Sequence, residues 1–152
     1  MKVYIGGSFQ SQKRLRPIRD QLFSLGIEVV SSWLDECAMP SDMPKDVFDK
    51  QLAIKDLTEV RAADCIIVDT FDPSTTGGRM VEWGYALGHT KLRYVVGADN
   101  CIFFKLADYH FRSWGELFDF FKENHMTEAY IATGMEGKEF VHASKEVSKV
   151  CA

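Results

Sequence analysis

Apolar and polar residues follow two different periods along this chain. Residues 2–5 form a short run of β-favouring side chains that ends at a pair of glycines. Residues 11–25 then carry apolar side chains at three- and four-residue steps, the spacing of an amphipathic helix: Leu15, Ile18, Leu22 and Leu25. Because proline is tolerated only in a first helical turn, we expect the regular helix to begin close to Pro17, and Gly26 is a natural C-terminal cap.

The alternation of strand and helix patterns continues to about residue 122. Further strands are predicted at residues 27–30, 65–69, 94–97 and 101–104, and further helices at residues 46–63, 79–89 and 114–122. The run Cys65–Val68 is the most apolar in the chain and is typical of a central parallel strand that is buried on both faces. Residues 125–152 have no clear period, although residues 136–150 could form a polar helix.

Strands that alternate with helices indicate right-handed β-α-β units, a parallel sheet and helices on both of its faces. We therefore expect an α/β fold in a single domain of residues 1–152, in which residues 125–152 are a C-terminal extension without a readable role. In such sheets, ligands bind at the carboxyl ends of the strands, near the point where the strand order reverses. This rule selects three loops as candidate sites: residues 6–10, 31–45 and 70–78.

The composition limits the kinds of molecule that this protein is expected to bind. The net charge of −4 does not favour a polymeric nucleic acid as the partner, whereas a small nucleoside or nucleotide stays open. No apolar run approaches the roughly 18 residues that span a bilayer, so no membrane contact is expected. The four cysteines are scattered, with no CxxC pair and no Cys/His cluster at metal spacing. Reduced thiols indicate a cytoplasmic protein. Neither a metal nor an organic cofactor is expected.

Glu82 is the strongest candidate for chemistry. It is the only acid in the predicted helix at residues 79–89, whose other side chains are almost all apolar. A carboxylate on a helix without a polar face is costly unless it is paired, metal-bound or protonated. The structural alternative is an ion pair with Arg79, which lies three residues earlier on the same face.

Asp56 and Tyr4 are weaker candidates on their own. Asp56 lies at the edge of the apolar stripe of its helix, and a solvated or lysine-paired aspartate is the structural alternative. Together with Glu82, it would supply the two carboxylates that glycosidic chemistry requires, one to attack the anomeric carbon and one to manage the proton of the leaving group. The phenol of Tyr4 could orient a catalytic carboxylate, or Tyr4 could be a core tyrosine with a satisfied hydroxyl.

Two loops of small residues could line a ligand. Gly6-Gly7-Ser8 and Ser74 to Gly78 could each hold an anion or a sugar hydroxyl through backbone N–H groups, although small-residue loops are usually turns. Neither loop has the spacing of a dinucleotide fingerprint or of a P-loop. Trp33 follows the second predicted strand and could stack on a base, or it could be a partly buried loop side chain.

Three segments together resemble the nucleoside 2-deoxyribosyltransferase family and the related 2′-deoxynucleoside 5′-phosphate N-hydrolases: Val3 to Ser8, Asp56 to Val68, and Gly77 to Ala86. The resemblance covers roughly residues 2–104, and its most specific part is the glycine turn, glutamate and glycine around Glu82. It implies a flavodoxin-like three-layer sandwich with a five-stranded parallel sheet. It also implies a homo-oligomer with active sites near the subunit interfaces.

Transferred residue by residue, the resemblance assigns roles to the same candidates. The nucleophilic glutamate of the family falls on Glu82, the aspartate that handles the nucleobase falls on Asp56, and the tyrosine that positions the nucleophile falls on Tyr4. The substrate-binding residues would be Gly6, Gly7, Ser8, Trp33, Thr76, Gly77 and Gly78.

Thr76 departs from the pattern. Transferases of the family carry an aspartate there, against the sugar 5′-hydroxyl, and the N-hydrolases carry a serine. A threonine at this helix N-terminus favours tolerance of a 5′-phosphate, which an aspartate would repel.

The resulting prediction is a transferase that moves deoxyribose from a 2′-deoxynucleoside to a free nucleobase through a covalent bond to Glu82. One alternative is hydrolysis of a 2′-deoxynucleoside 5′-monophosphate, with water in place of the second base. An alternative of another class is a nucleotide-binding or sensor module without turnover, since one fold hosts many functions.

Overall fold

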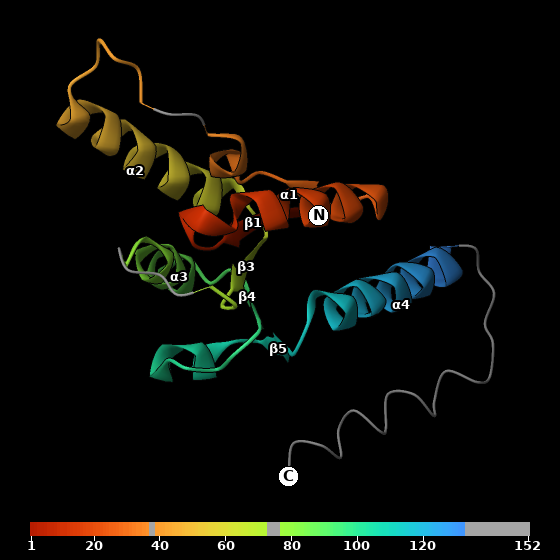
Figure 1. Cartoon of the computed structure of the whole chain (residues 1–152). Helices are drawn as coiled ribbons and strands as arrows, with labels where there is room; N and C mark the ends of the chain where they lie inside the picture. The colour runs from red at the N-terminus through yellow and green to blue at the C-terminus, as the bar shows by residue number, and fades with distance from the viewer. Residues whose placement is uncertain (37–38, 73–76, 133–152) are drawn as a thin grey trace. The chain divides into compact units, whose positions relative to one another are not determined.

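Five short runs of residues form one parallel sheet (Figure 1). The strands are β1 (Lys2–Gly6), β2 (Glu28–Val29), β3 (Cys65–Asp69), β4 (Leu92–Val96) and β5 (Tyr109–Phe111), and their order is β2-β1-β3-β4-β5. Each neighbouring pair is parallel. All five residues of the central strand β3 are buried, as predicted for this apolar run.

The structure, a computed structural model, describes residues 1–36, 39–72 and 77–132, with side chains up to residue 124. The chain divides into two units, Met1–Phe118 and Asp119–Ala152, and helix α4 (Trp114–Ala132) runs through the boundary. Thr76 and the polar helix predicted for residues 136–150 lie outside the described residues. Within the described part of the chain, no helix combines the length and the apolar character that a membrane span requires.

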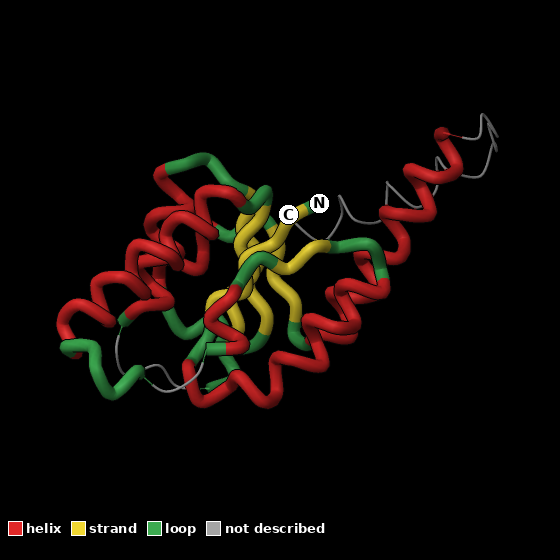
Figure 2. Tube along the Cα trace, turned by 90° about the horizontal axis from the view of Figure 1, so that it is seen from above, coloured by secondary structure: helices red, strands yellow, loops and turns green. Residues whose placement is uncertain are grey.

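Three helices connect the strands and cover both faces of the sheet. Helix α1 (Gln12–Ser24) joins β1 to β2, α2 (Lys45–Ala62) joins β2 to β3, and α3 (Gly78–Gly88) joins β3 to β4. The first crossover runs in one direction across the sheet and the next two run in the other. With the usual right-handed connection, α1 therefore lies on the face opposite to α2 and α3 (Figure 2). The order of the strands and the two helical layers confirm the flavodoxin-like α/β sandwich.

The start of α1 differs from the prediction. The helix begins at Gln12, preceded by the 3-10 helix η1 (Phe9–Ser11), and Pro17 lies inside it. A proline there removes one helical hydrogen bond and costs about 3 kcal/mol. Leu15 and Leu22 are both completely buried, and each such burial contributes about 1.5–3 kcal/mol. Packing therefore outweighs the local preference.

The end of α1 is as predicted. Gly26 has a φ of +77°, which a glycine adopts without strain. The N–H of Ile27 donates to the carbonyl of Leu22 at 3.1 Å, and the N–H of Gly26 donates to that of Phe23 at 2.9 Å. These two bonds form a Schellman motif, which directs the chain into β2.

The predicted position of the fifth strand is wrong. Residues 102–106 form the 3-10 helix η3 (Ile102–Leu106), and the strand follows as β5. A short apolar run does not by itself distinguish a strand from a helical turn. An ion pair sets the actual return to the sheet: Asp108 accepts bonds from the guanidinium and the backbone N–H of Arg93, and its own N–H donates to the Arg93 carbonyl at 2.8 Å.

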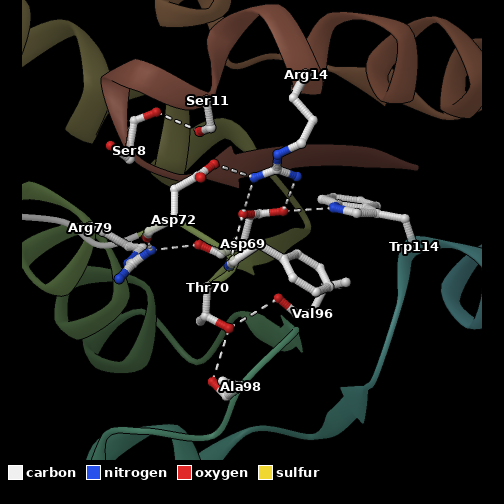
Figure 3. Close-up of polar contacts among 11 residues, drawn as sticks. Ser8, Ser11, Arg14, Asp69, Thr70, Asp72, Arg79, Val96, Ala98 and Trp114 are labelled. Atoms are coloured by element: carbon white, nitrogen blue, oxygen red, sulfur yellow. Dashed lines mark hydrogen bonds and ion pairs between the residues drawn. The ribbon is translucent and has the colours of Figure 1, made fainter.

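A network around Asp69 holds the carboxyl end of β3 (Figure 3). The side chain of Asp69 is completely buried and accepts two hydrogen bonds from Arg14, at 2.7 and 3.0 Å, and one from the Trp114 indole at 2.7 Å. The backbone N–H of Phe71 adds a fourth at 3.2 Å. Four donors compensate the loss of hydration, so this carboxylate joins α1, β3 and the first residue of α4 at low net cost.

Replacing Asp69 by Asn should destabilise the protein by about 2–4 kcal/mol, because the Arg14 guanidinium loses its buried counter-charge and the amide cannot satisfy the same donors. The free energy of unfolding in urea measures the effect. Asp108→Asn is the matched control: its carboxylate is 31% exposed, whereas that of Asp69 is completely buried, so the loss should stay below about 1 kcal/mol. Equal losses in the two variants would contradict a special role for Asp69.

Candidate active site

The candidate site lies where the strand order reverses, at the carboxyl ends of β1 and β3. Helix α3 starts directly beside this point. Gly77, at its N-cap position, has a φ of +75°, a left-handed conformation that lets the chain turn into the helix. Glu82 follows in the second turn of α3, close to the end of β1.

The structure brings Glu82, Tyr4 and Gly6 together. The hydroxyl of Tyr4, on β1, donates a hydrogen bond of 2.9 Å to Oε1 of Glu82. The other carboxylate oxygen, Oε2, is buried and has no hydrogen-bond partner in the part of the chain that the structure describes. A Cβ atom at Gly6 would lie only 2.8 Å from this Oε2, so the glycine is what allows the carboxylate to sit against β1.

The surroundings of Glu82 favour its protonated form. The pKa of Glu82 is raised to about 7, mainly by burial and also by the negative charges of Asp56 and Glu59. The hydrogen bond from Tyr4 and the charge of Arg79 act in the opposite direction. One oriented oxygen and one free oxygen are what a carboxylate nucleophile would require.

Tyr4 is suited to hold the carboxylate rather than to react. It is completely buried, and burial followed by the charge of Glu82 raises the pKa of its phenol far above the usual value. The hydroxyl therefore keeps its proton and stays a donor across the physiological pH range. Tyr4 was predicted to be either a core side chain or a side chain that orients a carboxylate. In the structure it is both.

Asp56 lies in the fourth turn of α2, near enough to raise the pKa of Glu82. Its own pKa is raised to about 6, mainly by burial and also by Glu36 and Glu59, while Lys55 acts in the opposite direction. Oδ1 of Asp56 is buried and has no hydrogen-bond partner among the described residues. Lys55 forms its ion pair with Glu36, so the lysine-paired alternative for Asp56 is not the one observed.

The ion pair considered for Arg79 and Glu82 does not form. Nη1 of Arg79 instead donates to the backbone carbonyls of Asp69 at 2.6 Å and Asp72 at 3.2 Å. Figure 3 shows this guanidinium at the end of β3. Glu82 is therefore a buried carboxylate whose single hydrogen-bond donor among the described residues is a neutral phenol.

Trp33, Gly7 and Ser8 lie near the end of β1 and are engaged in contacts within the protein. Trp33 is only 6% exposed, and its indole N–H donates to the Ile5 carbonyl at 2.7 Å. A Cβ atom at Gly7 would meet Leu15 at 3.0 Å and the Trp33 ring at 3.4 Å, so Gly7 serves close packing. The carbonyl of Ser8 accepts hydrogen bonds from the backbone and side chain of Ser11.

The sequence did not point to the acids around Asp56. Glu59 lies three residues after Asp56 on α2, and this spacing was a usable signal. Glu36 belongs to the segment between β2 and α2, where periodicity gives no information about position. Among the described residues, no group of three or more His, Cys, Asp or Glu side chains is placed to hold a metal ion.

No family model and no curated protein matches this sequence significantly. Solved structures do match, at low identity. A 2-deoxyribosyltransferase of Bacillus psychrosaccharolyticus is 17% identical with a TM-score of 0.66, and the match covers 78% of this chain and 91% of that one. A 2-deoxyribosyltransferase of Leishmania mexicana is 18% identical with a TM-score of 0.56, covering 82% and 98%.

A third matching structure is named as an N-glycosidase rather than as a transferase. The CMP N-glycosidase of Clostridium botulinum is 16% identical with a TM-score of 0.52, covering 80% of this chain and 98% of that one. At these identities the likeness concerns the fold. The chain has the fold of the nucleoside 2-deoxyribosyltransferases and of this N-glycosidase.

Proposed function

We propose that this protein is an enzyme that breaks the N-glycosidic bond of a 2′-deoxynucleoside and transfers the deoxyribosyl group to another nucleobase. The observation that carries the proposal is the buried Glu82 carboxylate, with Oε1 held by Tyr4 and Oε2 free against Gly6. Two proteins of the same fold are named as 2-deoxyribosyltransferases and a third as a CMP N-glycosidase, which supports the proposal.

The reaction follows from the two carboxyl groups. Oε2 of Glu82 attacks C1′ of the deoxyribose, the bond from C1′ to the base nitrogen breaks, and its electron pair leaves with the base. Asp56, in its protonated form, gives its proton to the departing base. A second base then enters, loses a proton to Asp56 and attacks C1′, which releases Glu82 with retention of configuration.

The hydrolase alternative differs only in the acceptor. Water in place of the second base would give free deoxyribose or its 5′-phosphate, and Thr76 in place of an aspartate would favour the 5′-monophosphate as substrate. In either reaction the residues Ser8, Thr76, Gly77 and Gly78 would line the sugar and its 5′ side. Assembly into a homo-oligomer stays a prediction of the family resemblance.

The direct test compares wild-type protein with Glu82→Ala and Glu82→Gln on deoxynucleosides and deoxynucleotides, each with and without a second free base. Base exchange identifies a transferase, and free base plus sugar identifies a hydrolase. Both variants should lose turnover at least about ten-thousandfold. Mass spectrometry of acid-quenched wild-type protein should find a deoxyribosyl group on the peptide that contains Glu82.

Glu28→Gln is the control, because Glu28 is exposed on the edge strand β2 and should leave turnover unchanged. Glu82→Gln should be at least as stable as the wild type at pH 8, because it removes a buried charge. Normal turnover in Glu82→Ala would overturn the proposal. Silence of the wild type toward every substrate would favour the binding module.

Gly6→Ala should inactivate the enzyme without unfolding it. The added Cβ would lie 2.8 Å from Oε2 of Glu82, so the carboxylate must shift away from its bond with Tyr4. A misplacement of a reacting group by about 1 Å costs about a hundredfold in kcat. Gly88→Ala, on the helix that carries Glu82, adds a Cβ with nothing within 4 Å and should keep full activity. Equal activity in both variants would remove the role assigned to Gly6.

The pH dependence should be bell-shaped. Catalysis needs Glu82 ionised and Asp56 protonated, yet the pKa of Glu82, about 7, exceeds that of Asp56, about 6. The competent form is therefore a minority that is most populated between these two values. The ratio kcat/KM should fall about tenfold per pH unit below pH 6, where Glu82 is protonated, and above pH 7, where Asp56 is ionised. A rate that keeps rising to pH 9 would exclude Asp56 as the proton donor.

A further inference from the structure

Arg79 is a positively charged group beside Glu82, and the proposed reaction does not use it. It lies in the first turn of α3, is 8% exposed, and is held in place by Nη1, which donates to the carbonyls at the end of β3. Its Nε is buried without a hydrogen-bond partner. Among the described residues, no carboxylate forms an ion pair with it.

A guanidinium in this position is unexpected if its task is only to hold α3. Two backbone carbonyls can be satisfied by a neutral donor, whereas burying a positive charge that forms no direct ion pair costs several kcal/mol, which the more distant charges of Asp69 and Asp72 offset only in part. Burial accordingly lowers the pKa of Arg79. The carbonyl contacts alone therefore do not explain why this position carries a positive charge. Glu82, three residues later on the same helix, is a carboxylate that a positive charge would keep ionised.

Glu82 faces an environment that favours its protonated form. Burial raises its pKa most, and Asp56 and Glu59 of α2 raise it as well, whereas the hydrogen bond from the neutral Tyr4 of β1 lowers it. Arg79, on α3 itself, is the positive charge that acts on Glu82, and Asp69 at the end of β3 acts on Arg79.

The geometry brings the two side chains to one place. A Cβ atom built at Gly6 has Oε2 of Glu82 at 2.8 Å and Cγ of Arg79 at 3.8 Å, so both side chains pack over the same glycine. The carbonyl bonds fix the guanidinium at the end of β3 and stop it from closing onto the carboxylate as an ion pair. Oε2 thereby keeps a nearby positive charge and remains free to attack.

We propose that Arg79 is a positioning residue of the reaction, whose fixed charge keeps Glu82 ionised without occupying its attacking oxygen. This inference rests on the proposed function for its consequence in catalysis. The effect of Arg79 on the ionisation of Glu82 is a property of the protein alone and can be measured without a substrate.

The test uses Arg79→Gln, which removes the charge and keeps a donor for the carbonyls, and Arg79→Lys, which keeps the charge. Titration of the Glu82 carboxyl by carbon-13 NMR should find its pKa about one unit higher in Arg79→Gln and near the wild-type value in Arg79→Lys. Arg93→Gln, a charge removal on the opposite end of the sheet, is the control and should leave the titration unchanged. An unchanged Glu82 titration in Arg79→Gln overturns the proposal whether or not the protein is an enzyme.

Kinetics distinguish a positioning role from a purely structural role and from binding of a substrate anion. Arg79→Gln should be about tenfold slower than the wild type in kcat at pH 6, and the difference should vanish as the pH rises. At low pH a smaller fraction of Glu82 is ionised in the variant than in the wild type, whereas at high pH Glu82 is ionised in both. A deficit that is equal at every pH would mean that Arg79 only maintains the structure. A rise in KM confined to a 5′-monophosphate would mean that Arg79 binds the substrate anion. Either result overturns the proposal.

If Arg79→Gln does not fold, as judged by circular dichroism, Arg79→Lys supplies the deciding comparison. Because it keeps the charge, it should retain the wild-type titration of Glu82 and the wild-type pH profile even though its contacts with the carbonyls change. A shifted titration in Arg79→Lys would show that the carbonyl contacts, and not the charge, set the ionisation of Glu82, and the proposal would fail.

Discussion

The hydrogen bond from Tyr4 to Glu82, made over a glycine, links the strand, the helix and the chemistry of this protein. It requires a buried phenol on β1, a carboxylate in the second turn of α3, and no side chain at Gly6 between them. Each of these conditions restricts the packing around it: β1 must pair with β3, and α3 must cross close to the end of β1. A larger residue at Gly6, or a different start of α3, would separate the two groups. The position of the site therefore follows from the packing of two elements that are far apart in sequence.

Two buried carboxylates at the same end of the sheet illustrate opposite uses of the same group. Asp69 accepts four hydrogen bonds, including two from Arg14, and so repays its loss of hydration by joining three parts of the chain. Glu82 accepts one bond, from Tyr4, and keeps an oxygen without any partner. A satisfied carboxylate stabilises the fold, whereas an unsatisfied one stores unfavourable free energy that a substrate can release. This difference separates a structural acid from a reactive one more clearly than burial does.

The electrostatics of the site result from a balance among few groups. Burial, together with the neighbouring acids Asp56 and Glu59, favours the protonated form of Glu82, and Arg79 opposes it. The pKa values of the two acids, about 7 for Glu82 and about 6 for Asp56, lie close to neutrality as a consequence. Groups with pKa values near the working pH exchange protons efficiently, which is what the proposed transfer between two bases would need.

The sequence by itself determined the fold class and the position of most elements, because these depend on local periods and on turn residues. The apolar run of β3 and the glycine after α1 were predicted correctly for this reason. Tertiary packing decided what local patterns leave open: α1 continues through Pro17 because its apolar face is buried, and residues 102–106 form a 3-10 helix because the sheet is completed by a later strand. The candidates Glu82, Asp56 and Tyr4 came from sequence, but their relation did not. Which carboxylate oxygen is held and which is free, and that Arg79 binds carbonyls rather than Glu82, depend on contacts between residues up to 78 positions apart, which no local pattern encodes.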